Sequence, residues 1–197
     1  MASLVKAKEN LEARGYAVQL FPDKESAAEY LNGAIDGTTV GFGGSVTLDQ
    51  MGLFPALGRH NTVFWHWKQN PADARASAAN AAVYLSSVNA LAETGEIINI
   101  DGAGNRVAST LYGHQKVYLV ISRNKLAEDY ESALWRARNI AAPKNAQRLN
   151  RKTPCAVKAD RCYDCKSPER ICCGLVVLWR PVMGQDMEII LVDEDLG

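Results

Sequence analysis

The five cysteines of this 197-residue chain all fall in one segment, which reads CAVKADRCYDCKSPERICC. Six residues separate Cys155 from Cys162, two separate Cys162 from Cys165, and six separate Cys165 from Cys172. A C-x-x-C step lets two thiolates turn toward one ion, and thiolates on flanking loops can complete a four-sulfur site for zinc or an iron–sulfur cluster. The spacing therefore predicts a metal site whose ligands are Cys155, Cys162, Cys165 and Cys172. Cys173 is expected to point elsewhere, because adjacent side chains in an extended chain face opposite sides.

Two other interpretations of the cysteines stay open. The chain begins with MASLVKAKENLEARG, which is typical of an amphipathic helix and not of a secretory signal. A cytoplasmic location is therefore predicted, where disulfides seldom persist. The alternatives to a metal site are five inert reduced thiols, or a redox disulfide with a spare thiol.

Three loops follow predicted strands, at the position where an open parallel sheet holds a ligand. Their sequences are GFGGS at 41–45, SSVN at 86–89 and DGAGNR at 101–106. Glycine in such loops lets the backbone approach a ligand closely. We therefore expect one concave site that binds a small anionic metabolite. Its predicted lining consists of Gly43, Gly44, Ser45, Ser87, Asn89, Asp101, Gly102, Gly104, Asn105 and Arg106.

Neither glycine loop carries a nucleotide-binding fingerprint. G-x-G-x-x-G would require glycine in place of Val46 or Val107, and no P-loop sequence occurs. The candidates for catalysis are Asp101, Arg106 and Asp49. A carboxylate facing an arginine could orient a hydroxy or keto acid or act as a base, and the planar fork of Arg106 suits a carboxylate or phosphate. Equally, Asp101 could cap a turn and pair with Arg106 structurally.

The elements around these loops alternate between strand and helix. Apolar runs predict strands at 16–21, 38–42, 62–67, 82–86, 96–100 and 116–121. The clearest helix is expected over 127–142, ended by Pro143. The alternation predicts an α/β fold with a mostly parallel sheet flanked by helices. After the cysteines, 174–179 and 187–192 are expected to form two late antiparallel strands that pair at a sheet edge.

Length and composition indicate a single domain. We expect a main α/β body over 1–150, a cysteine-rich appendage over 151–173 and C-terminal strands over 174–197. Lysine plus arginine number 22 and aspartate plus glutamate number 22, so the net charge is zero. This balance argues against nucleic acid as a partner, and no apolar stretch is long enough to span a bilayer.

Three long runs carry a resemblance to a known family. They are VGFGGSVTLDQMGL at 40–53, SSVNALAETGEIINIDGAGNRVA at 86–108 and TPCAVKADRCYDCKSPERIC at 153–172. These runs resemble the LUD family, the lactate-utilisation or YkgG-like proteins, and the resemblance covers nearly the whole chain. It implies a fold similar to the NagB/RpiA/CoA-transferase group, in which phosphate or thioester substrates lie on glycine-rich loops. Better-studied members belong to a multi-protein system that oxidises L-lactate to pyruvate beside separate iron–sulfur subunits.

Three functions follow as competing hypotheses. The first is a redox-associated component of L-lactate or hydroxy-acid utilisation, with a small-anion cleft, an iron–sulfur cluster or zinc at the cysteines, and iron–sulfur partner subunits. The second is a stand-alone sugar-phosphate isomerase or CoA-transferase-like enzyme. The third is a regulatory or scaffold protein with a structural metal. A homo-oligomer is compatible with each, and the question of catalysis stays open.

Overall fold

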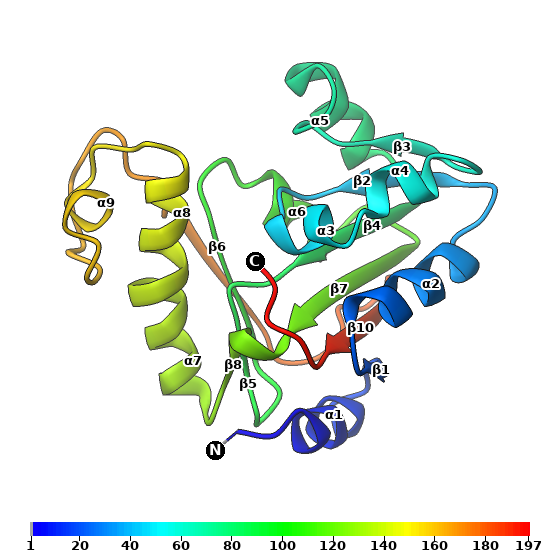
Figure 1. Ribbon diagram of the computed structural model, residues 1–197, viewed down its shortest axis with the longest axis horizontal. Coiled ribbons are helices and arrows are strands. Elements are labelled where there is room, and N and C mark those ends of the chain that lie inside the picture. Colours follow the sequence, from blue (N-terminus) through cyan, green and yellow to red (C-terminus); the bar gives the residue numbers. More distant parts are fainter. Residues whose placement is uncertain (1) are drawn as a thin grey trace.

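Six parallel strands form the central sheet of the computed structural model, which describes residues 2–197 (Figure 1). In order across the sheet they are β1 (Ala17–Phe21), β10 (Asp186–Val192), β7 (Lys116–Ser122), β4 (Val83–Ser87), β2 (Thr39–Phe42) and β3 (Thr62–Phe64). Every neighbouring pair is parallel. The α/β fold with a mostly parallel sheet is thus confirmed.

The two strands β7 and β10 are buried on both faces. In β7, Val117 and Leu119 point into one core and Tyr118 and Val120 into the other. A strand that is covered on both faces has a continuous run of apolar residues. The β7 sequence KVYLVIS is such a run, which explains why the sequence predicts this strand clearly.

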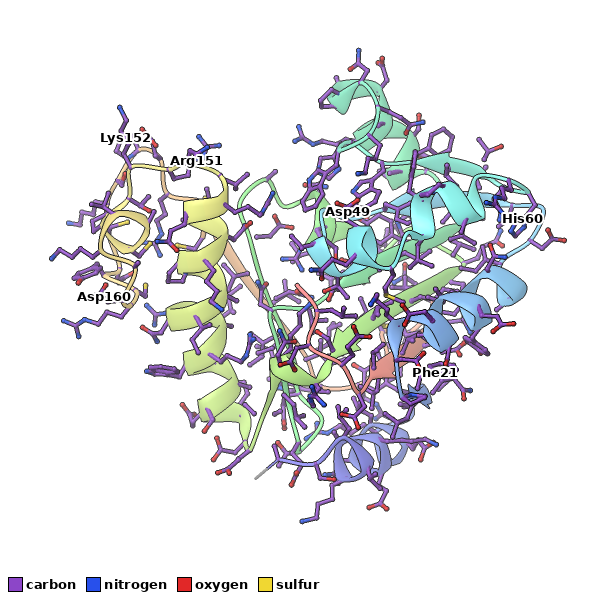
Figure 2. The ribbon with its side chains drawn as sticks, in the orientation of Figure 1. Phe21, Asp49, His60, Arg151, Lys152 and Asp160 are labelled. Carbon is purple, nitrogen blue, oxygen red and sulfur yellow. The ribbon has the colours of Figure 1, made fainter. Side chains whose placement is uncertain are left out.

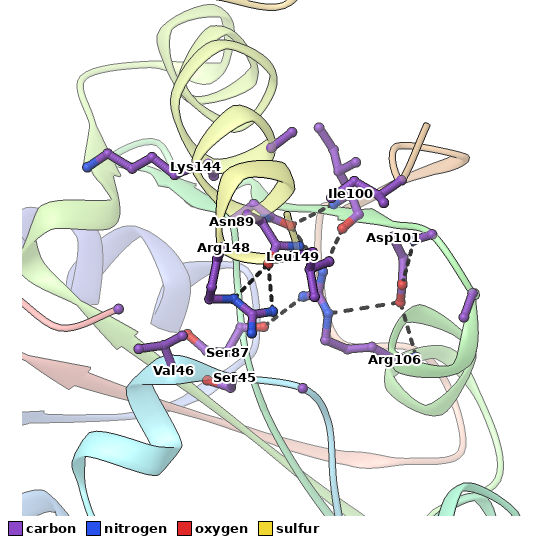
Figure 3. Close-up of a pocket in the computed structure, with 18 of the residues that line it drawn as sticks. Ser45, Val46, Ser87, Asn89, Ile100, Asp101, Arg106, Lys144, Arg148 and Leu149 are labelled. Atoms are coloured by element: carbon purple, nitrogen blue, oxygen red, sulfur yellow. Dashed lines mark hydrogen bonds and ion pairs between the residues drawn. The ribbon is translucent and has the colours of Figure 1, made fainter. Parts of the chain in front are cut away.

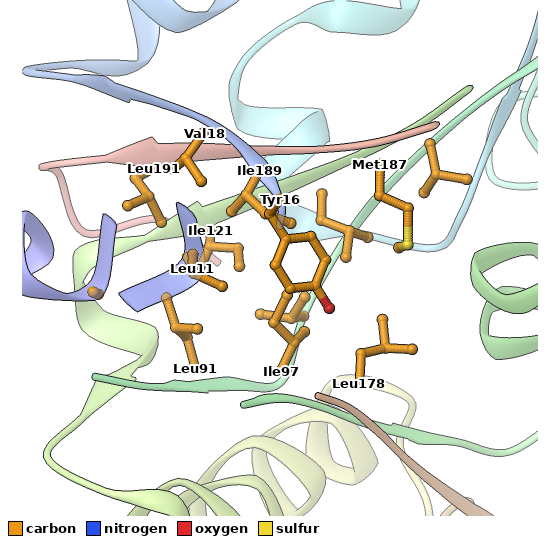
Figure 4. Close-up of a cluster of buried hydrophobic side chains, with 14 of the residues drawn as sticks. Leu11, Tyr16, Val18, Leu91, Ile97, Ile121, Leu178, Met187, Ile189 and Leu191 are labelled. Carbon is orange, nitrogen blue, oxygen red and sulfur yellow. The ribbon is translucent and has the colours of Figure 1, made fainter. Parts of the chain in front are cut away.

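Helices and a second sheet cover the two faces. One face carries α2 (Lys24–Ala34), α3 (Val46–Gln50) and α4 (Leu53–Leu57). The other face packs against α1 (Leu4–Ala13), α5 (Pro71–Ala79) and the second sheet. Figure 4 shows the hydrophobic core on this face, in which Leu91, Ile97 and Leu178 of the second sheet face Ile189 and Leu191 of β10.

The second sheet was not expected from the sequence. Its order is β8 (Leu126–Ala127), β5 (Ala90–Ala92), β6 (Ile97–Asp101) and β9 (Gly174–Leu178). β6 pairs antiparallel with both β5 and β9. The run at 96–100 is therefore a strand, as predicted, but it lies outside the parallel sheet.

The predicted pairing of two late antiparallel strands is wrong. β9 pairs with β6 in the second sheet, whereas β10 lies between β1 and β7 in the central sheet. Burial explains the separation, because six of the seven β10 residues are buried and β9 is exposed over its first two. An apolar strand of this kind belongs in a sheet interior, and a half-exposed one at an edge.

The helix predicted over 127–142 continues beyond Pro143. It consists of α7 (Tyr130–Arg136), a π-helical segment (Ala137–Ala141) and α8 (Ala142–Arg148). Pro143 occupies the first turn of α8, where a missing N–H leaves no helical hydrogen bond unmade, and the π-helical segment absorbs the change of register. Small side chains of this helix, Ala133 and Ala137, pack on Ala90 and Ile98 of the second sheet.

Two shorter helices complete the structure, α6 (Asn105–Leu111) and α9 (Pro154–Lys158). Within residues 2–197, no helix has the length and hydropathy of a bilayer-spanning segment.

Candidate functional site

A cavity of about 760 Å³ lies at the carboxyl ends of β2, β4 and β7. The loops that leave these strands form its floor, and α8 and the cysteine segment form its far wall. Because the three strands are parallel, their carboxyl ends meet at one edge of the sheet, where α/β proteins hold their ligands. Its volume is that of a metabolite-sized site.

Most of the residues predicted to line a shared cleft do so. They are Gly44, Ser45, Ser87, Asn89, Asp101, Gly102, Asn105 and Arg106. The loop 101–106 leaves the second sheet, yet it meets the loops of the parallel sheet here. Binding of a ligand by these residues stays a prediction.

Three predicted residues lie outside the lining. Gly43 lies beneath Arg106, where a Cβ would come within 2.8 Å of Ser86 Oγ. Gly104 adopts φ +81° and begins α6. Asp49 is exposed on α3, and its carboxylate lies 2.7 Å from Lys68 Nζ, so its catalytic role stays a prediction (Figure 2).

The two terminal nitrogens of the Arg106 guanidinium donate their hydrogen bonds to the protein itself (Figure 3). One terminal nitrogen donates to Ser87 O at 3.0 Å and to Asn99 Oδ1. The other donates to Asn89 Oδ1 at 3.1 Å and to Ile100 O at 2.6 Å. All four terminal hydrogens therefore join the loop after β4 to the end of β6, and bidentate binding of an anion through both terminal nitrogens would require breaking two of these bonds.

Asp101 caps the start of α6. Its carboxylate accepts hydrogen bonds from the backbone N–H groups of Gly102 at 2.7 Å and of Arg106 and Val107 at 3.1 Å. Burial lowers the pKa of Arg106, and the charge of Asp101, 3.9 Å from Nε, opposes that shift. Asp101 and Arg106 therefore both have structural partners. This structural role is the alternative to catalysis that the sequence left open.

Sequence reasoning missed Lys125, which ends a short 3-10 turn directly after β7. Its side chain lines the cavity and is only 7% exposed, and Nζ donates to Thr47 Oγ1 at 2.6 Å and to Ser87 Oγ at 2.7 Å. Burial, together with the positive charges of Arg136 and Arg106, lowers the pKa of Lys125 to about 7. The sequence could have indicated Lys125 as a site residue, because it lies just past a predicted strand of the parallel sheet.

The cavity is strongly cationic. Of the described residues that line it, eight are lysine or arginine and one, Asp101, is acidic. Besides Arg106 and Lys125, the cations are Arg75, Arg136, Lys144, Arg148, Arg151 and Arg170. Since the whole chain has no net charge, this concentration is local and creates a positive potential that attracts anions.

Several of these cations are held in place by neighbours. The Arg148 guanidinium lies 4.6 Å from the centre of the Trp67 ring, a cation–π contact across the cavity wall. Arg136 donates to Asn124 O at 2.8 Å and to Asn89 O at 2.6 Å, which ties α7 to the loops after β7 and β4. By contrast, Arg75, Lys144 and Arg151 are exposed, Arg151 just beyond the end of α8.

The cysteine segment holds five free thiols, of which the four predicted ligands are half-buried and Cys173 is exposed. The Asp164 N–H donates to Cys162 Sγ at 3.3 Å. Burial raises the pKa of the Cys172 thiol, and the proximity of Cys162 adds to that rise. Across residues 2–197, no three His, Cys, Asp or Glu side chains are gathered closely enough to hold one metal ion. The metal site therefore stays a prediction.

The same segment forms part of the cavity wall. Arg170 donates to Cys172 O at 2.9 Å and to Cys165 O at 2.8 Å, and its side chain lines the cavity together with Ile171. Gly102 permits this packing, since a Cβ there would come within 2.8 Å of Ile171 O. The cysteines and the cavity are thus adjacent parts of one structure.

Comparison with known proteins gives a family. A DUF162 family protein from Deinococcus radiodurans, known from its crystal structure, covers 96% of this chain and 95% of its own, with a TM-score of 0.55 and 12% sequence identity. Ribose 5-phosphate isomerase A from Neisseria gonorrhoeae covers 53% of each chain, with a TM-score of 0.35 and 15% identity. No curated protein matches. The LUD domain matches residues 4–192, and the chain therefore belongs to the LUD domain family.

Proposed function

We propose that this protein binds a small carboxylate metabolite of the hydroxy-acid or oxo-acid class in the cavity, as a component of L-lactate or hydroxy-acid utilisation. The observation that carries the proposal is the excess of eight lysine and arginine side chains over one aspartate in the described lining. The cavity volume of about 760 Å³ admits such a ligand with its water. Membership of the LUD family supports the metabolic role, in which the protein would act beside iron–sulfur subunits.

The cations of the cavity fall into two groups with different roles in binding. Arg106 and Arg136 already donate to protein acceptors, so they shape the floor and contribute charge. Arg75, Lys144 and Arg151 are exposed along the wall and free to turn toward a carboxylate. Exposed cations steer an anion and set its orientation more than they hold it tightly.

Charge reversal at Lys144 tests the proposal. Lys144→Glu is expected to weaken binding of pyruvate and L-lactate about fivefold, because it replaces an attraction worth about 1 kcal/mol at an exposed site. Isothermal titration calorimetry at two salt concentrations measures the affinity, which should fall with added salt.

The matched control is Arg180→Glu, which reverses an exposed charge outside the cavity lining and should leave the affinity unchanged. The absence of saturable binding by either acid would contradict the proposal. Ribose 5-phosphate and acetyl-CoA belong in the same titration, since exclusive binding of one of them would favour the isomerase or CoA-transferase alternative.

We propose in addition that Cys155, Cys162, Cys165 and Cys172 bind zinc or an iron–sulfur cluster. Their spacing, their shared half-burial and the N–H donated to Cys162 Sγ support this, because backbone N–H groups stabilise thiolate ligands. The regulatory or scaffold alternative would use the same site for a structural metal.

Protein purified without oxygen is expected to contain stoichiometric zinc or iron, with visible absorbance if a cluster is present. Cys165→Ser should lose the metal, since a thiolate ligand is removed, whereas Cys173→Ser should retain it. Metal analysis and the absorbance spectrum make the comparison. Metal-free wild-type protein, or equal loss from both variants, would contradict the assignment.

A further inference from the structure

The amine of Lys125 has hydroxyl partners only. Nζ donates to Thr47 Oγ1 at 2.6 Å and to Ser87 Oγ at 2.7 Å. The Ser87 hydroxyl hydrogen is itself donated to Val120 O at 2.6 Å, so Ser87 acts toward Lys125 as an acceptor. Two hydrogens of Nζ are thus placed on protein oxygens, and within residues 2–197 no third protein acceptor is bonded to it.

The surroundings of Lys125 disfavour a charged ammonium. A buried ammonium ordinarily requires a carboxylate partner, and no carboxylate in the described chain forms an ion pair with Nζ. The charged groups that act on it are Arg136 from α7 and Arg106 from α6, both positive. Asp101, the acidic residue of the lining, is already occupied by the backbone of α6. The backbone of Gly197 lies near Thr47 and Nζ, since a Cβ built there would come within 2.6 Å of Thr47 Oγ1 and 3.2 Å of Nζ, and Gly197 and Lys125 both line the cavity.

This arrangement has the properties of a nucleophilic lysine. Lysine amines become reactive where they are desolvated beside other cations, because the neutral form carries the lone pair that attacks. The lowered pKa of Lys125, about 7, agrees with the geometry. The neutral amine uses its two hydrogens for Thr47 and Ser87, which leaves the lone pair as the remaining position on a nitrogen that lines the cavity.

We propose that Lys125 forms an imine with the carbonyl carbon of an oxo acid bound in this cavity, an inference that rests on the proposed function. The lone pair of Nζ forms the new C–N bond, and the C=O bond breaks. The two hydrogens held by Thr47 and Ser87 leave with the carbonyl oxygen as water, so the step needs no oxidant or reductant. The cations of the wall bind the carboxylate of the same molecule. A hydroxy acid has no carbonyl carbon at this position and binds without reacting.

Reductive trapping tests the imine directly. The full chain is incubated with pyruvate and sodium borohydride, and its intact mass and proteolytic peptides are then measured. We expect one reduced pyruvate adduct per chain, located on Lys125. Its rate of formation should rise about tenfold from about pH 6 to about pH 8, since the neutral fraction of an amine with a pKa of about 7 rises by that factor.

Controls separate the imine from nonspecific labelling. Lys125→Met should abolish the adduct, whereas Lys6→Met, which replaces an exposed lysine of α1 outside the cavity, should leave it intact. L-Lactate should compete with trapping and give no adduct itself. Peptide mapping of the wild type decides the question even if Lys125→Met fails to fold.

The two proposals fail in different ways. Pyruvate that binds by calorimetry but labels surface lysines as readily as Lys125, or labels none, overturns the imine and leaves the carboxylate site standing. If neither pyruvate nor L-lactate binds, the proposed function is overturned and the imine with it.

Discussion

Arg106→Lys is expected to lower the free energy of unfolding by about 3 kcal/mol. The arginine fork satisfies four acceptors on Ser87, Asn89, Asn99 and Ile100, and it does so from a buried position. A lysine keeps the charge but has three hydrogens on one atom, so it cannot reach acceptors arranged around a planar group. Urea unfolding followed by circular dichroism measures the loss.

Arg75→Lys is the matched control, because Arg75 lines the same cavity but is exposed. It should change the stability by less than about 0.5 kcal/mol. The sequence suggests a different role for Arg106, which is the recognition of an anion. Unchanged stability with weakened anion binding in Arg106→Lys would restore that interpretation and show that the fork leaves its protein acceptors to bind the ligand.

Gly41→Ala is expected to destabilise the protein by about 2 to 3 kcal/mol. Gly41 lies within β2, where it pairs with Phe64 of β3 and Tyr84 of β4. A Cβ there would come within 2.5 Å of Ala78 O and 2.9 Å of Ala78 Cα. These are backbone atoms of α5, so the contact is relieved only by moving the helix away from the sheet.

Gly33→Ala provides the contrast. Gly33 lies in the last turn of α2, and a Cβ there would meet nothing within 4 Å. Alanine should therefore stabilise the protein by about 0.5 kcal/mol through its higher helix propensity and the reduced freedom of the unfolded chain. Thermal unfolding of both variants checks the opposite signs. A Gly41→Ala protein as stable as the wild type would show that α5 packs more loosely on β2 than the structure indicates.

The expected effect at Gly41 also changes how the GFGGS run is understood. The sequence predicts that Gly43 and Gly44 of this run line a ligand cleft, directly after the strand that contains Gly41. In the structure Gly41 serves the packing of α5, Gly43 makes room for Arg106, and Gly44 lines the cavity beside Trp67. A glycine signals a close approach of some atom, and only the fold shows whether that atom belongs to a ligand or to the protein.

The sequence by itself determined the parallel sheet and the place of the cavity. Apolar runs such as 116–122 report burial on both faces, and loops after parallel strands meet at one edge whatever their partners are. The crowding of all five cysteines into 155–173 is likewise a fact of the sequence. These features depend on which residues follow one another along the chain, so the sequence alone is enough to recognise them.

The tertiary structure alone decided which strands share a sheet and which side chains have partners. β9 and β10 are neighbours in sequence but belong to different sheets, because pairing depends on what covers each face. Arg106 and Lys125 are both cations that follow strands. Arg106 places its four terminal hydrogens on protein acceptors, whereas Lys125 donates to two hydroxyl groups and forms no ion pair with a carboxylate within residues 2–197. Burial and pairing are set by residues far away in the chain, such as Ser87, which is 19 residues from Arg106, and Thr47, which is 78 residues from Lys125, and no local pattern encodes them.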